Sequence, residues 1–136
     1  MQTYNLENDL KLFYIEAETF PSGVEAAFKN LEGLLPSTEG RTFYGLSNMN
    51  QQGGINYKAA VLEEYEGEGE KYGCKNITVK QGTYLVETIF DWRNNKELIG
   101  PTFQTMLADK RLDPDSFCIE WYKGNDQVEL MVKINP

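Results

Sequence analysis

An acidic residue stands inside an apolar, aromatic stretch, since residues 117–122 are Phe-Cys-Ile-Glu-Trp-Tyr. Alternate side chains of a strand face opposite ways, so Glu120 is expected to share a face with Cys118 and Tyr122, while Trp121 points away. A carboxylate in such surroundings is costly unless it finds a donor, a counter-ion or a proton. A cationic ligand held beside aromatic rings would meet that need. The other interpretation is a solvated edge acid or the partner of a neighbouring lysine, and the strand alone leaves both open.

Four aromatic residues are candidates to line a pocket with this carboxylate. Tyr122 shares the expected face of Glu120 and could stack on a ligand or donate to the acid. Tyr57 and Tyr44 are candidate aromatic walls from the first half of the chain, and Trp92 could close the mouth of a cleft. Each of them could equally be an ordinary core aromatic. No catalytic residue is assigned, and Glu120 would take that role only if the protein were an enzyme.

Length and charge exclude several classes of protein. A chain of 136 residues with 40% hydrophobic and 25% charged residues fits one domain with a single core. The formal charge of −8, from 21 acids and 13 bases, repels a phosphate backbone and favours cationic or neutral partners. We therefore expect no direct binding of nucleic acid.

The side chains that commonly bind metals or act as nucleophiles are scarce. The chain has no His, which removes the usual zinc ligand and the Ser-His and Cys-His pairs. Cys74 and Cys118 are far apart and belong to no C-x-x-C pattern, so both are expected to be reduced. The acidic stretch 63–70 indicates a solvated loop, not a metal site with fixed geometry. We expect no metal and no cofactor, and, without an apolar span or an export leader, a cytoplasmic protein that does not insert into membranes.

The apolar spacing predicts an α+β fold. Apolar residues recur every three or four positions after Gly23 until Pro36, which is typical of an amphipathic helix, and they alternate strictly over 128–134, which is typical of a strand. The complete prediction comprises helices at 22–35 and 96–110 and strands at 10–19, 41–48, 55–65, 76–80, 83–92, 117–122 and 128–134. The Gly-rich acidic segment 66–73 is expected to be an exposed connection.

This order of elements occurs twice. Strand, helix, strand and strand follow one another over residues 10–65 and again over 83–135, a repeat of pattern and not of identity. We expect one domain over 1–136, built of two pseudo-repeats at about 5–66 and 74–136. The sheet should be mainly antiparallel, with a helix on each unit and a central ligand cleft between the halves.

Over about residues 5–135 the chain resembles the gyrase-inhibitor-like small-molecule-binding family, which also supplies effector-binding domains of AraC-type and MerR-type multidrug regulators. The resemblance rests on four short motifs, namely Phe20-Pro21-Ser22-Gly23, Gly82-x-Tyr84, Cys118-Ile119-Glu120-Trp121-Tyr122 and Val128-Glu129-Leu130-Met131-Val132. It implies a duplicated fold with a cleft, and a Glu in the penultimate strand that pairs with cationic aromatic ligands. That position falls on Glu120. Trp121 departs from the family pattern, where Ile is usual.

Three functions remain open at this stage. The first is a stand-alone effector-binding protein for cationic or amphipathic aromatic compounds, linked to transcription regulation or to drug sensing or sequestration. The second, implied by hydrolases within the same family, is an enzyme that uses Glu120 on reactive small molecules. The third is an interaction module that binds a regulator or a topoisomerase through its acidic surface.

Overall fold

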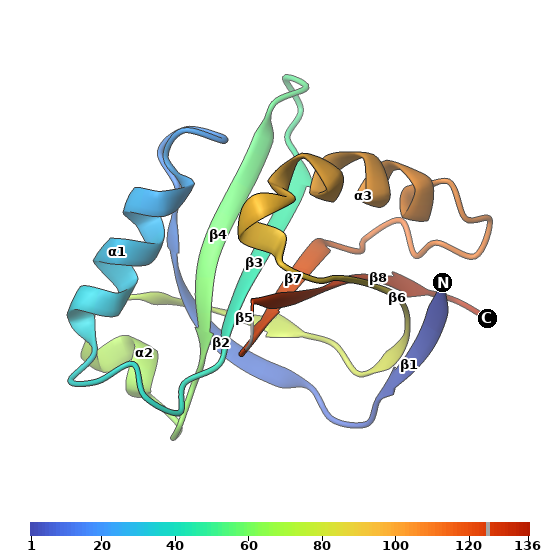
Figure 1. Cartoon of the computed structure of the whole chain (residues 1–136). Helices are drawn as coiled ribbons and strands as arrows, with labels where there is room; N and C mark the ends of the chain where they lie inside the picture. Colours follow the sequence, from blue (N-terminus) through green and yellow to red (C-terminus); the bar gives the residue numbers. More distant parts are fainter. Residues whose placement is uncertain (125) are drawn as a thin grey trace.

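The computed structural model describes residues 1–124 and 126–136. In these ranges eight antiparallel strands form one sheet that curls into a half-barrel, accompanied by three α-helices (Figure 1). The strands are β1 (Gln2–Leu6), β2 (Leu10–Glu16), β3 (Phe43–Met49), β4 (Ile55–Leu62), β5 (Lys75–Val79), β6 (Gly82–Ile89), β7 (Cys118–Lys123) and β8 (Gln127–Ile134). The helices are α1 (Val24–Leu34), α2 (Glu68–Lys71) and α3 (Ile99–Leu107). The predicted α+β class is confirmed.

The order of the strands in the sheet is β1-β6-β8-β7-β3-β4-β2-β5. The central pair, β7 and β3, joins the two halves of the chain, and each half contributes the succession strand, helix, strand, strand on its own side of that pair. Each half also has one strand before this succession, and that strand pairs with the other half. β1 pairs with β6, and β5 pairs with β2. This arrangement supports the proposal that the chain is one domain of two pseudo-repeats.

Both long helices cover the same face of the sheet. The α1 side chains Ala27 and Leu31 pack on Phe13, Ala59 and Val61, while those of α3 pack over β6 and β8. The strand registers place these residues on the same face as Glu120, which lies between the two helix-covered clusters. A third cluster, with members from both edges of the strand order, lines the inside of the curl on the opposite face.

Several predicted boundaries differ from those observed. The polar segment Gln2–Leu6 is the edge strand β1, which was not expected. The strand predicted at 83–92 ends at Ile89, so Phe90 lies outside it with 68% of its surface exposed. The helix predicted at 96–110 is shorter, because short 3-10 turns over 92–94 and 96–98 precede α3. No helix in the described ranges has the length and apolar character of a membrane span.

The acidic connection between the halves is also more ordered than predicted, because it contains α2 and a buried ion pair. Arg41 donates to both carboxylate oxygens of Glu68, at 2.9 and 2.8 Å, and also to the carbonyl of Leu62. The side chains of Arg41 and Glu68 are only 4% and 3% exposed. Burial alone would raise the pKa of Glu68, but the bonds from Arg41 and from the Glu64 amide hold it below its usual value.

Candidate functional site

Glu120 lies in the middle of the sheet. It occupies β7, where it pairs with Gly45 of β3 on one side and Leu130 of β8 on the other. Its residue surface is 7% exposed, so the carboxylate has lost most of its contact with water. The predicted alternation along β7 is observed, since Glu120 and Tyr122 face the helices and Trp121 faces the inside of the curl.

Two tyrosine hydroxyls hold the carboxylate. Tyr57 of β4 donates to Glu120 Oε1 at 2.7 Å, and Tyr122 donates to the same oxygen. The two hydroxyl oxygens are 3.4 Å apart. Within the described ranges no hydrogen bond reaches Oε2, and no ion pair includes Glu120. The acid therefore has neutral donors on one oxygen, without a positive charge beside it.

The surroundings favour protonated forms of all three groups. Burial raises the pKa of Glu120, and the hydrogen bonds from Tyr122 and Tyr57 offset only part of that rise. Burial, followed by the charge of Glu120, also raises the pKa values of Tyr57 and Tyr122, so both phenols remain donors. A carboxyl group with a raised pKa is responsive to any cation that approaches, because a positive charge would stabilise its ionised form.

Aromatic rings from both halves of the chain pack around these three groups. Phe20 stacks on Tyr57 with ring centroids 5.8 Å apart, and Phe28 of α1 contacts Tyr57 and Tyr122 edge-on at 6.2 and 5.7 Å. Trp92, in the turn after β6, lies 5.0 Å from the Tyr122 ring. We call Phe20, Phe28 and Trp92 the aromatic cover. The sequence singled out Trp92 but missed Phe20 and Phe28.

The aromatic cover leaves the carboxylate little contact with solvent in this conformation, since Glu120 is 7% exposed. Of the two cavities described below, neither is lined by Glu120. An aromatic ligand that contacts the carboxylate would therefore have to lie against or between the rings of the cover. Phe20 is the member best placed to move, because it is 43% exposed and lies in the connection between β2 and α1.

Tyr44, the other candidate aromatic wall from the first half of the chain, does not lie in this group. It points to the opposite face of the sheet, where its ring stacks against Trp121 with centroids 6.2 Å apart. The adjacent aromatics Phe43 and Tyr44 necessarily face opposite sides of β3. The sequence pattern of this strand did not show which of the two would face the helices.

Gly45 is a residue of the site that sequence reasoning missed. It lies opposite both Ala59 and Glu120 in the sheet. A β-carbon at Gly45 would overlap the Tyr57 hydroxyl and lie 2.6 Å from Tyr57 Cζ and 2.7 Å from Glu120 Oε1. The absence of a side chain therefore makes room for the bond between Tyr57 and Glu120. An isolated Gly within a strand pattern was the available signal.

Replacing Gly45 with Ala is expected to lower the free energy of unfolding by about 1–3 kcal/mol, because the new methyl group must push the Tyr57 ring or the carboxylate aside. Urea unfolding measures the change. Gly33→Ala is the matched control: apart from the backbone of its own helix and its chain neighbours, no atom lies within 4 Å of its added β-carbon. Ala in a helix is favoured over Gly by about 1 kcal/mol. If Gly45→Ala and the parent chain are equally stable, then the bond between Tyr57 and Glu120 does not require the absence of a side chain at Gly45.

No family model matches the chain, and no curated protein matches it in sequence. Its fold is similar to those of several solved structures. An integron cassette protein from the mobile metagenome of Vibrio cholerae matches with a TM-score of 0.68 and 14% identity, covering 98% of this chain and 94% of that one. The protein SAV2435 bound to tetraphenylphosphonium matches with a TM-score of 0.61 and 16% identity, covering 97% and 93%.

A third similar structure is a candidate bacterial transcription regulation protein from Staphylococcus aureus MU50. It matches with a TM-score of 0.56 and 15% identity, covering 97% of both chains. At these identities the likenesses show a shared fold, and one of the proteins with this fold was captured with a bound cationic ligand.

Proposed function

We propose that this protein binds cationic or amphipathic aromatic small molecules at Glu120, as an effector-binding protein linked to transcription regulation or to drug sensing or sequestration. One observation carries the proposal: a carboxylate only 7% exposed is surrounded by aromatic rings and has no cationic partner in the described part of the chain. An uncompensated charge of this kind is costly, and an aromatic cation would supply both the counter-charge and contacts to the rings.

Two further features support this proposal. Glu120 Oε2 accepts no hydrogen bond from the described residues and is the oxygen that a ligand could approach. The formal charge of −8 attracts cations to the molecule as a whole. The shared fold with a tetraphenylphosphonium-bound protein and with a candidate regulator, together with the four sequence motifs, supports a place in the gyrase-inhibitor-like family.

A pair of ligands of similar shape and different charge tests the proposal. We expect calorimetric titration to give a dissociation constant for tetraphenylphosphonium at least about 10-fold lower than that for neutral triphenylphosphine oxide, a difference of about 1.4 kcal/mol. Equal affinities, or no heat from either compound at millimolar concentration, would contradict it.

The hydrolase alternative is favoured by one feature of the same site. A buried carboxyl group with a raised pKa, bonded to two phenols, could exchange a proton with a substrate or a water molecule. Incubation with strained cyclopropane compounds and mass spectrometry of the products would reveal turnover. Turnover that disappears in Glu120→Gln would favour the enzyme, whereas unchanged substrates would favour the binding protein. The third function, a regulator or topoisomerase partner, stays a prediction for a pull-down.

A further inference from the structure

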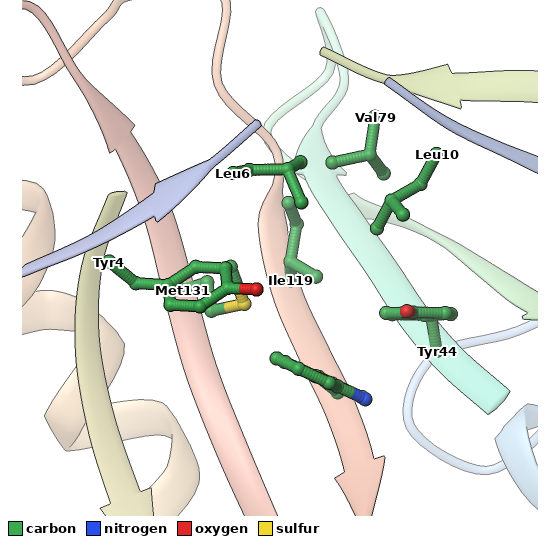
Figure 2. A pocket seen from close by; sticks show the side chains of 8 residues that line it. Tyr4, Leu6, Leu10, Tyr44, Val79, Ile119 and Met131 are labelled. Carbon is green, nitrogen blue, oxygen red and sulfur yellow. The ribbon is translucent and has the colours of Figure 1, made fainter. Parts of the chain in front are cut away.

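A separate cavity of about 150 Å³ lies inside the curl of the sheet, on the face opposite to Glu120. Its lining residues come from six strands, including both edge strands (Figure 2). They are Tyr4, Leu6, Leu10, Tyr44, Val79, Ile119, Trp121 and Met131. Ile119 and Trp121 are the neighbours of Glu120 in β7 and point away from it, so the sheet separates this cavity from the site at Glu120.

The lining is apolar except for a few single polar atoms. None of the eight side chains is charged. Tyr44 is the most informative of them, because its residue surface is only 4% exposed and its hydroxyl bonds to no described residue. The buried phenol of Tyr84, in contrast, donates to the Lys80 carbonyl at 2.5 Å. Burial, and then the nearby Tyr4 phenol, raise the pKa of Tyr44 to about 12, so its hydroxyl remains a donor.

Because Tyr44 lines the cavity and its hydroxyl has no partner among the described residues, a bound molecule with an acceptor would give this donor a hydrogen bond. Apolar cavities of about 150 Å³ tend to stay dry and to accept a molecule the size of benzene. A charged ligand is disfavoured, because the lining offers it no counter-charge. We propose that this cavity is a second binding site, independent of Glu120, for a small neutral aromatic molecule with one polar group, of the phenol type.

A neighbouring cleft borders this cavity. Val79 and Ile119 also line a larger, polar cleft of about 490 Å³, so these two side chains are shared by both spaces. Charged residues of the cleft form ion pairs with one another, at 3.8 Å for Lys80 with Asp9 and 3.3 Å for Lys133 with Asp113. Four of the five charged residues of the cleft have partners in this way and Asp115 does not, so the cleft is better suited to admit a neutral molecule than to retain an anion.

Trp121 provides a direct reporter of binding. The chain has two Trp residues, so Trp92→Phe leaves Trp121, in the cavity wall, as the single indole. In this variant we expect 4-iodophenol to quench the Trp121 fluorescence in a saturable way, with a dissociation constant of about 1 mM or lower. Quenching that rises linearly with concentration and never saturates would overturn the proposal.

Further variants, made in the same Trp92→Phe background, locate the ligand. Tyr44→Phe keeps the ring and removes the hydroxyl, so 4-iodophenol should bind about 5- to 10-fold more weakly while iodobenzene is unaffected. Val79→Phe fills the cavity and should abolish saturable quenching by both compounds. If circular dichroism shows that Val79→Phe does not fold, Leu10→Phe fills the cavity from another strand. Binding that survives the folded filling variant, or that Glu120→Gln abolishes, would place the phenol elsewhere and overturn the proposal.

Discussion

Replacing Glu120 with Gln is expected to weaken the binding of tetraphenylphosphonium by about 10-fold or more, a loss of at least about 1.4 kcal/mol. The amide keeps the shape of the side chain, and its oxygen can still accept from Tyr57 and Tyr122, so the lost quantity is the negative charge. Desolvated contact between a cation and aromatic rings contributes about 2 kcal/mol that this variant retains. Calorimetric titration of both proteins measures the difference.

Neutral ligands and pH provide the controls for this first prediction. Triphenylphosphine oxide should bind the variant equally well or better, because the desolvation of a charge no longer opposes it. The pKa of Glu120 is raised by burial, so cation binding to the parent protein should weaken as the pH falls through that raised pKa and the carboxylate takes up its proton. The variant should show no such dependence. Equal cation affinity of parent and variant would make Glu120 a purely structural acid.

Replacing Arg41 with Met is expected to lower the free energy of unfolding by about 3–5 kcal/mol, because Glu68 would remain buried without its partner. The parent pair is 2.8 Å apart and almost fully enclosed. The pKa of Glu68 is lowered in the folded protein. Its contribution to stability is therefore fully present above the pKa that Glu68 has in the unfolded chain, and it is lost as the pH falls through the lowered pKa of the folded protein. The stability difference between parent and variant should therefore shrink in acid. Denaturant unfolding at neutral and acidic pH measures it.

Two variants control this second prediction. Lys29→Met breaks the exposed pair with Glu25, whose side chains are 72% and 81% exposed, and should change stability by no more than about 0.5 kcal/mol. The double variant Arg41→Met with Glu68→Leu removes both charges and should recover most of the loss. A loss below about 1 kcal/mol for Arg41→Met alone would show that Glu68 reaches water when its partner is removed.

The elements that could be predicted from the sequence are those with a clear periodicity. The alternation in residues 117–122 correctly gave the faces of Glu120, Tyr122 and Trp121, because the period of a strand is two irrespective of its partners. The same period places Tyr57, Ala59 and Val61 on one face of β4, where Ala59 and Val61 pack in the cluster under α1 and Tyr57 stacks on Phe20. In such strands the alternation of side chains alone shows which residues share a face.

Elements that depend on distant partners could not be predicted in this way. β1 is exposed at four of its five positions, so it has no apolar pattern, and only its pairing with β6 makes it a strand. Glu68 lies in an acidic, Gly-rich run typical of exposed loops, and its burial depends on Arg41, which is 27 positions away. The sequence of β3 also does not show which face Tyr44 takes, because the face of β3 is set by its neighbours β4 and β7.

The crossing of β1 and β5 bears on how the chain can be divided into fragments. A cut in the connection after β4 would leave the two pieces joined by three pairings, β1 with β6, β3 with β7 and β2 with β5, and by the Arg41–Glu68 pair. Each piece alone would expose unpaired strand edges at all of these places. Neither piece has a complete sheet without the other. The two pieces are therefore suited to fragment complementation, in which a reporter fused to the fragments detects their reassociation.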